Sequence, residues 1–277
     1  MIEAGITLVK LYPGPAPVRG GVSAAELGIR TMEYRRSDAS LDAHQDVLFR
    51  LASHMRLSPH HVLMPAFVTL SGRLVRLEPL SLAVVDDLVA AASEDRSTYA
   101  FTRVPNGRDE MVSYVEAALA EQAEGRTLPF AIRWLHTDRV VGATRLMHLE
   151  YWQGPMPWPP GARGAVGDVP SVADIGYTWL AASAQGTGVN RESKYLMLSL
   201  AFETWQVHRI TLKADVRNVR SRTAIEALGA HLDGVRRAES RGADDTVRDT
   251  AYYSILSSEW PLVRERLHAR MGMVEAA

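Results

Sequence analysis

Cysteine is absent from this chain of 277 residues. Disulfides, thiolate metal sites and a cysteine nucleophile are therefore excluded. A strong charge is missing as well: the formal net charge of -1 argues against a generally basic protein that binds nucleic acid. No run approaches the ~18 apolar residues of a membrane-spanning helix, and the first residues lack the apolar core of a signal peptide. The expected location is the cytoplasm, with neither nucleic acid nor membrane as a partner.

The composition that is present suits an ordinary globular protein, with 47% hydrophobic and 23% charged residues. The turn-rich PGPAPVRGG at 13–21 and a helical apolar spacing at 41–56 set the first part of the chain apart. We expect an N-terminal extension at 1–65, partly helical or disordered, and one domain at 66–277. The extension is interpreted as a docking segment, a dimer element or an over-long gene start before Met64.

From about residue 67 the apolar spacing alternates between strand and helix periods. Seven segments are predicted to be strands: 73–80, 128–135, 139–149, 173–181, 208–216, 231–238 and 247–256. Helices are predicted at 82–92, 110–122, about 191–206, 221–230 and about 258–270. The Pro/Gly-rich segment 150–172 predicts a long loop, and such loops inside a domain are usually functional or disordered.

The segment QGTGVN at 185–190 lies between a predicted strand and a predicted helix. Helix starts carry unpaired N–H groups and a partial positive charge, which favour an anion. Gly186 and Gly188 let the backbone approach a phosphate, and Asn190 is a favoured N-cap residue. The segment is not a Walker A loop, because no G-K-S/T follows. It is not a dinucleotide fingerprint either, because Arg191 stands where the third glycine belongs. Taken alone, it is more simply interpreted as a glycine-rich turn with an ordinary cap.

A second polar segment, DVRNVRSRTAIEALGA at 215–230, begins where the next strand ends. Asn218 can offer an amide to a carbonyl-rich ligand, and Ser221 offers a hydroxyl three residues later. Turn chemistry and helix capping explain both residue types equally well.

Five segments in this order resemble the GNAT acyltransferase superfamily, specifically the Rim-type ribosomal-protein N-terminal acetyltransferases and their bacterial relatives. They are RLVRLEPL, DIGYTWL, NRESKYLMLSLAFE, RNVRSRTAIEALGA and VRDTAYYSILSSEWP, and the resemblance covers about 67–265. It implies an α+β GNAT fold: a mixed, mostly antiparallel central sheet of about seven strands, splayed between strands 4 and 5 and flanked by helices. It also implies an N-acetyltransferase in which acetyl-CoA occupies the splay and a primary amine attacks it directly in a ternary complex.

The resemblance implies which residues bind acetyl-CoA. The pyrophosphate would be bound by backbone amides of Gln185, Gly186, Thr187, Gly188, Val189 and Asn190, the last of which departs from the usual Gly or Ala. The pantetheine arm would pair with the backbone around Trp179 and Leu180 and would also meet Asn218. Charge-assisted bonds to the 3′-phosphate could come from Arg217, Arg220 and Arg222, for which a solvated basic face is the alternative.

Catalysis by amine attack needs a base, a donor to the developing oxyanion and a donor to the leaving thiolate. Many GNAT enzymes place a Tyr seven residues after the Asn, where this chain has Ile225, which cannot donate. Ser221 takes the position that Rim-type relatives use and is the expected thiolate-side donor. A backbone amide near Leu180 is the expected oxyanion donor.

Asp174 opens the strand before the loop and is the expected base, although a structural acid held by a backbone or Arg partner is the alternative. Glu150 and His148 are weaker candidates. Tyr151, Trp152 and Trp158 either line an acceptor pocket or pin the long loop to the core.

The expected partners are acetyl-CoA and an amine acceptor, either a protein N-terminus or a small molecule, and a homodimer is a further candidate. The nine histidines show no metal-binding spacing, so no metal is expected. Asn190 and Ile225 motivate the alternative function, a non-catalytic acyl-CoA-binding module.

Overall fold

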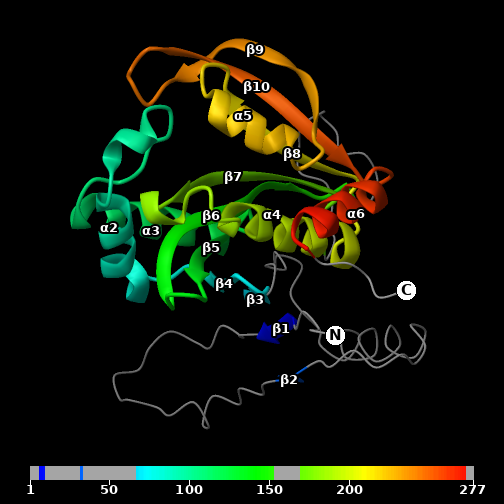
Figure 1. Ribbon diagram of the computed structural model, residues 1–277, viewed down its shortest axis with the longest axis horizontal. Helices are drawn as coiled ribbons and strands as arrows, with labels where there is room; N and C mark the ends of the chain where they lie inside the picture. The colour runs from blue at the N-terminus through cyan, green and yellow to red at the C-terminus, as the bar shows by residue number, and fades with distance from the viewer. Residues whose placement is uncertain (1–5, 10–31, 34–66, 153–168, 273–277) are drawn as a thin grey trace.

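One mixed sheet organises the described residues, 6–9, 32–33, 67–152 and 169–272, of this computed structural model. Its strands lie in the order β2-β1-β3-β4-β5-β6-β7-β8-β10-β9, and only β7 and β8 run parallel (Figure 1). The strands are β1 (Ile6–Val9), β2 (Met32–Glu33), β3 (Phe67–Ser71), β4 (Val75–Pro79), β5 (Thr127–Trp134), β6 (Arg139–Glu150), β7 (Val172–Leu180), β8 (Arg209–Asp215), β9 (His231–Arg241) and β10 (Val247–Leu256).

All seven predicted strands are present, as β4 to β10. The sheet is larger than predicted because β3 forms a hairpin with β4, and β1 pairs with β3 and β2. Two short segments of the predicted extension, 6–9 and 32–33, thus lie in the sheet. The helix predicted at 41–56 and Trp158 lie outside the described residues.

The sheet splits between β7 and β8, the fourth and fifth of the predicted strands. Their parallel pairing runs only from Val172 opposite Arg209 to Ile175 opposite Leu212. Beyond that point β7 continues through a bulge at Tyr177, which has a positive φ of 50° and coincides with a register shift against β6. A bulge bends a strand and increases its twist, so β7 turns away from β8 and its last residues have no partner on that side (Figure 1).

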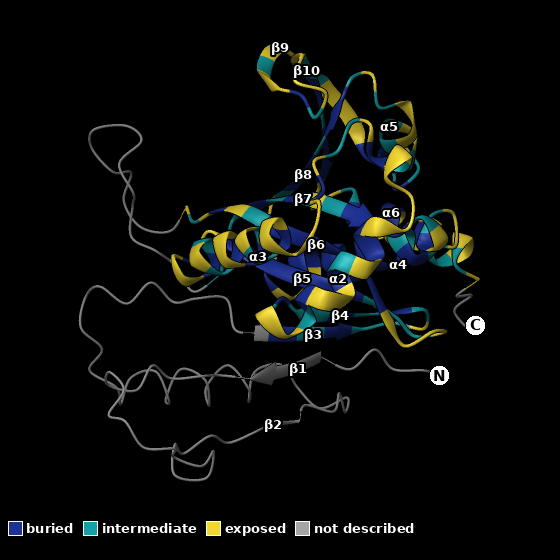
Figure 2. Cartoon of the chain, turned by 90° about the vertical axis from the view of Figure 1, so that its left-hand side faces the viewer, coloured by how far each residue is buried: buried dark blue, intermediate teal, exposed yellow. Residues whose placement is uncertain are grey.

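Helices cover both faces of the sheet (Figure 2). On β6 the side chain of Arg145 reaches Glu121 of α3, whereas that of Thr144 reaches Lys194 of α4. Neighbouring side chains of a strand point to opposite faces, so α3 and α4 lie on opposite sides. The helical segments are η1 (Leu82–Val84), α2 (Val85–Ser93), η2 (Arg96–Tyr99), α3 (Arg108–Ala123), η3 (Ala182–Ala184), α4 (Val189–Ser199), the π-helical η4 (Leu200–Thr204), α5 (Val219–Glu226) and α6 (Trp260–Arg270). Within the described ranges, no helix is both long enough and apolar enough to span a bilayer.

The start of α4 is fixed by Glu192, whose buried carboxylate accepts three successive backbone N–H groups of the β3–β4 hairpin. The donors are Arg73, Leu74 and Val75, at 2.9, 2.6 and 2.8 Å. A Cβ atom at Gly72 would lie 2.6 Å from the carboxyl carbon of Glu192, so a larger residue there would have to displace this carboxylate. Charge-assisted bonds of this kind are among the stronger ones in proteins, and they hold the helix start against the sheet.

Candidate active site

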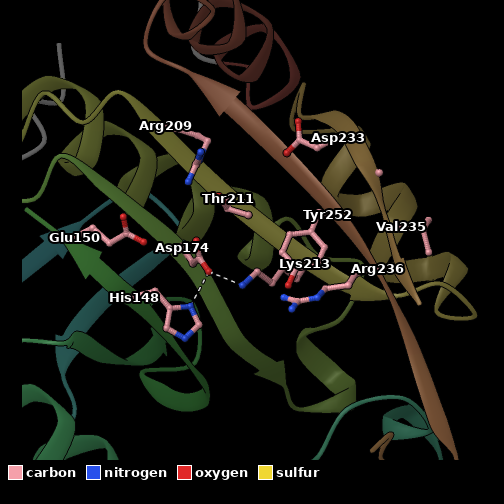
Figure 3. Close-up of a pocket in the computed structure, with 11 residues that line it drawn as sticks. His148, Glu150, Asp174, Arg209, Thr211, Lys213, Asp233, Val235, Arg236 and Tyr252 are labelled. Atoms are coloured by element: carbon pink, nitrogen blue, oxygen red, sulfur yellow. Dashed lines mark hydrogen bonds and ion pairs between the residues drawn. The ribbon is translucent and has the colours of Figure 1, made fainter. Parts of the chain in front are cut away.

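A cavity of about 580 Å³ lies over strands β6 to β10 (Figure 3). It is on the face of the sheet that α3 also covers. Asp174 faces this side because it pairs with Met147, two residues along β6 from Arg145. The lining side chains carry charges of both signs, and the residues are His148, Glu150, Asp174, Arg209, Thr211, Lys213, Asp233, Gly234, Val235, Arg236 and Tyr252. We call this cavity the charged pocket.

Asp174, the predicted base, is held by two neighbours in the charged pocket. Its Oδ2 lies 2.7 Å from Nδ1 of His148 and 2.8 Å from Nζ of Lys213 (Figure 3). Burial raises the pKa of this carboxyl, but the bonds from His148 and Lys213 together outweigh burial and leave the pKa lowered. An acid that is stabilised in its ionised form is a weak proton acceptor.

His148 is placed to work with that carboxylate. It stands at a bulge of β6 with a positive φ of 48°, and its side chain is 58% exposed. In a neutral imidazole, a carboxylate at Nδ1 favours the tautomer that carries its proton there and leaves the lone pair on Nε2. The structure thus brings Asp174 and His148, two of the candidate bases, into direct contact.

The loop at 185–190 connects η3 to α4 and makes two left-handed turns. Gly186 has a φ of 78° and Gly188 a φ of 95°, a region that glycine populates without penalty. Gly188 is the N-cap of α4 and has no side chain that could cap the helix; the hydroxyl of Thr187 lies 3.5 Å from the backbone N of Val189. The expected cap, Asn190, is instead the second residue of the helix, because the turn at Gly188 starts the helix earlier. Its Oδ1 is buried and has no partner among the described residues.

At the end of β7, backbone groups rather than side chains face the split. Trp179 and Leu180 are buried, and the ring of Trp179 meets that of Tyr99 edge-on at 6.4 Å. The carbonyl of Leu180 accepts bonds from Tyr99 Oη at 2.9 Å and Gln185 Nε2 at 3.0 Å. Thr187 bonds the carbonyl of Ala184, and Val189 is buried in the core.

Asn218 and Ser221 meet at the start of α5. Asn218 is the N-cap of this helix, and its Oδ1 accepts the backbone N–H of Ser221 at 3.0 Å. The capping alternative is thus realised, and it occupies only the oxygen of the amide. Asp174 is not brought into contact with Ser221, because Asp174 lies in the paired part of β7 whereas Ser221 follows the end of β8.

The three candidate arginines have different surroundings. Arg217 bonds the buried carboxylate of Asp215 at 2.7 Å, and this bond is the main reason why the pKa of Asp215 is lowered. Arg222 donates to Tyr253 Oη at 2.8 Å. Arg220 instead crosses from α5 to the other side of the split.

A second cavity, of about 790 Å³, was not predicted. It lies between the segment 96–105, the N-terminal part of α3, Tyr177 and Ala243. Beside it, Arg145 is buried between the rings of Tyr114 and Tyr177, at 5.0 and 4.0 Å. The bulge in β7 brings Tyr177 to this cavity, and the spacing of apolar residues in the sequence does not predict a bulge.

The long loop is described only at its ends. Tyr151 is half-buried against the core, and burial raises the pKa of its hydroxyl. Trp152 is exposed and stacks on His208 at 5.7 Å. Tyr151 therefore pins the start of the loop, whereas Trp152 stacks on His208, which lies just before β8.

Comparisons with known proteins agree with this geometry. The family model described as "Acetyltransferase (GNAT) domain" matches residues 74–231, more than half of the chain. The Bacillus subtilis protein named "Putative ribosomal N-acetyltransferase YdaF" is 32% identical over 88 residues, which are 32% of this chain and 47% of that protein. The chain thus spans about half the length of this curated relative.

Solved structures extend the likeness. A "putative acetyltransferase" from T. thermophilus is 32% identical with a TM-score of 0.58, over 73% of this chain and 96% of that one. The RimJ structure from Mycobacterium smegmatis, in complex with CoA-disulfide, covers 71% of this chain and 89% of its own; at 23% identity and a TM-score of 0.57 it supports the fold. No group of three or more His, Cys, Asp or Glu within the described ranges could hold a metal. The split sheet, the family match and these relatives show that the chain belongs to the GNAT acetyltransferase family and is similar to its Rim-type members.

Proposed function

We propose that this protein transfers an acetyl group from acetyl-CoA to a primary amine, with a protein N-terminus as the acceptor class. The observation that carries the proposal is the early end of the β7–β8 pairing at Ile175 and Leu212. It leaves residues 176–180, which pair with β6 on one side, without a strand partner on the side toward β8. An extended amide-containing arm can pair with such a strand edge, as a further strand does.

The residues at the split fit the cofactor. The N-cap of α4, Gly188, has no side chain, and the space beside Gly186 is open, since a Cβ there would meet nothing within 4 Å. Uncapped helix starts bind phosphate groups through their N–H donors. We assign the pyrophosphate to the backbone of Gln185 to Asn190, and the pantetheine arm to Asn218 and the strand edge at Trp179 and Leu180.

In the proposed reaction, the amine nitrogen forms a bond to the acetyl carbon and the carbon–sulfur bond breaks. His148, held by Asp174, takes the proton that the nitrogen loses, directly or through water. Ser221 donates a hydrogen bond to the departing thiolate, which then takes a proton from solvent. The products are an acetamide and the thiol of CoA, so atoms and charge balance without a further reactant.

A peptide acceptor is favoured by the form of the charged pocket. The pocket is open, spans five neighbouring strands and offers both acidic and basic side chains, which suits the mixed charges of a chain terminus. The name of the Bacillus subtilis relative refers to a ribosomal acceptor. A small amine needs fewer contacts than this surface provides.

The test combines binding and turnover. Acetyl-CoA binding is measured by calorimetry, and CoA release is followed with a panel of N-terminal peptides and small amines. The proposal expects binding together with acceptor-dependent release that is fastest with peptides. Absence of both binding and release contradicts it.

The second candidate is a module that binds acyl-CoA without turnover. It is favoured by the buried Ile225, which stands where many relatives have a donor, and by the lowered pKa of Asp174. Tight cofactor binding without acceptor-dependent release, unchanged in a Ser221→Ala variant, would support this candidate over the enzyme.

A further inference from the structure

The mouth of the β7–β8 split is bridged by one side chain. Arg220, in the first turn of α5, donates from Nη1 to Oε1 of Gln185 at 2.7 Å and from Nη2 to the carbonyl of Thr98 at 2.7 Å. Arg220 follows β8, whereas Gln185 follows β7, so the guanidinium spans the two strands where they diverge. We call this bridge the Arg220 strap.

The strap is continuous with the unpaired end of β7. The amide of Gln185 donates to the carbonyl of Leu180 at 3.0 Å and to Thr98 Oγ1 at 3.1 Å. A ligand arm that pairs with β7 at Leu180 must therefore displace bonds that the strap holds together. The strap is made of one exposed cation and neutral acceptors, which are weaker partners for a guanidinium than an anion is.

The geometry points to Arg220 as an exchangeable clamp for a diphosphate. We propose that the guanidinium leaves Gln185 and Thr98 when a pyrophosphate diester reaches the loop at 185–190, and then closes over it with a charge-assisted, two-pronged bond. This inference rests on the proposed function, because it assumes that CoA binds in the split. It goes further by naming the residue that closes over the cofactor and the phosphate group that this residue binds.

The two other arginines of the segment do not compete for this role. Arg217 is committed to Asp215 and Asp244, each at 2.7 Å, and its guanidinium lies over the ring of Phe101. Arg222 is bonded to Tyr253. Releasing either would leave a charged or buried partner unpaired, whereas releasing Arg220 leaves two neutral acceptors near solvent.

Three ligands separate the phosphate groups: CoA, dephospho-CoA, which lacks only the 3′-phosphate, and pantetheine, which has no phosphate. Dissociation constants are measured by calorimetry, and by competition for pantetheine, on the full chain and on Arg220→Gln, Arg220→Lys and the control Arg266→Gln. Arg266 is an exposed arginine of α6. Thermal unfolding of each variant checks the fold.

We expect Arg220→Gln to weaken CoA and dephospho-CoA equally, by about tenfold to a hundredfold, and Arg220→Lys to fall between this variant and wild type. Pantetheine binds Arg220→Gln as well as or better than wild type, because the strap no longer opposes it. Arg266→Gln behaves as wild type does.

Three results would overturn the clamp while leaving the proposed function intact. The first is that Arg220→Gln weakens the binding of CoA but not of dephospho-CoA, which would assign Arg220 to the 3′-phosphate. The second is that it weakens the binding of all three ligands equally, which would make the strap a structural contact. The third is that it weakens the binding of none of them. Failure of the wild-type chain to bind any of the three overturns the proposed function as well.

Discussion

The split and the charged pocket share strand β7, but they are built from different groups. At the split, residues 176–180 and the loop at 185–190 present mainly backbone, and the nearby carboxylates are paired within the protein. In the charged pocket, Asp174, Lys213 and His148 present ionisable side chains from three neighbouring strands. The difference suggests a division of labour: backbone donors recognise a cofactor common to the family, whereas side chains handle the proton and the acceptor.

The largest effect is expected from the charged pocket. His148→Gln should lower kcat by about 100-fold or more, because the proposed acceptor of the amine proton is lost, while the affinity for acetyl-CoA stays unchanged. Asp174→Asn should act similarly, and the double variant should lose little more, since the two act as a unit.

Steady-state rates and calorimetry on the same preparations check this split between kcat and affinity. His208→Gln, an exposed histidine outside the charged pocket, is the matched control. If His148→Gln had near-normal activity whereas Asp174→Asn were inactive, Asp174 alone would be the base.

The second largest effect is expected on the pH dependence of stability, from a buried lysine that contacts β7 next to the bulge at Tyr177. Lys194 of α4 is fully buried, and its Nζ donates to the hydroxyls of Thr144, at 3.1 Å, and of Thr178. Burial lowers the pKa of Lys194 from 10.5 to about 7. Between these values the unfolded chain binds a proton that the folded chain does not, so stability rises as the pH increases through this window.

Lys194→Met removes this dependence. Relative to the variant, wild type should gain about 2 kcal/mol or more in free energy of unfolding between pH 7 and pH 10. Denaturant unfolding at both pH values measures the difference. Parallel stability curves for the two proteins would show that Lys194 is charged in the folded state.

A tenfold effect is expected at the split. Gly188→Ala forces a side chain into a left-handed conformation, which costs about 1–2 kcal/mol, and shifts the helix start that is proposed to bind the pyrophosphate. The Kd for acetyl-CoA should rise by about tenfold, with kcat at saturation preserved. Gly272→Ala, which is also left-handed at a φ of 64° and has open space around its Cβ position, is the control for strain alone. Equal effects of the two variants on affinity would refute a role for the loop.

The smallest effect concerns Asn190, whose buried Oδ1 lacks a partner among the described residues. Asn190→Asp places a negative charge where the pyrophosphate is proposed to bind, whereas Asn190→Ser keeps the site neutral. We expect the Asp variant to bind acetyl-CoA about threefold to tenfold more weakly than the Ser variant, measured by calorimetry at low salt. Equal affinities would place the phosphates elsewhere.

The backbone-built region was the more predictable of the two. Gly186 and Gly188 signal left-handed turns before a helix, and Asn218 signals a helix cap, because local conformation limits the residue types at such places. The resemblance of five segments to the GNAT superfamily then implied the α+β fold and the position of the split. The cap at Asn190 was wrong, since Gly188 starts α4 two residues earlier.

The charged pocket could be predicted only in part. Asp174 was identified from its place in the strand, but its contacts with His148 and Lys213 depend on the register of β6 and β8 against β7 and on two bulges. One bulge, at His148, aims the ring at Asp174, and the other, at Tyr177, opens the split. Register and bulges are set by tertiary packing, so they leave no local pattern in the sequence.

The division of labour is tested most directly by backbone hydrogen exchange with and without saturating acetyl-CoA. The account predicts slower exchange at residues 176–180, at the loop and first turn over 185–191 and at the start of α5, with β9 and the outer part of β10 unchanged. Protection of β9 and β10 together with unchanged exchange over 185–191 would contradict it, because the cofactor would then occupy the charged pocket instead of the split.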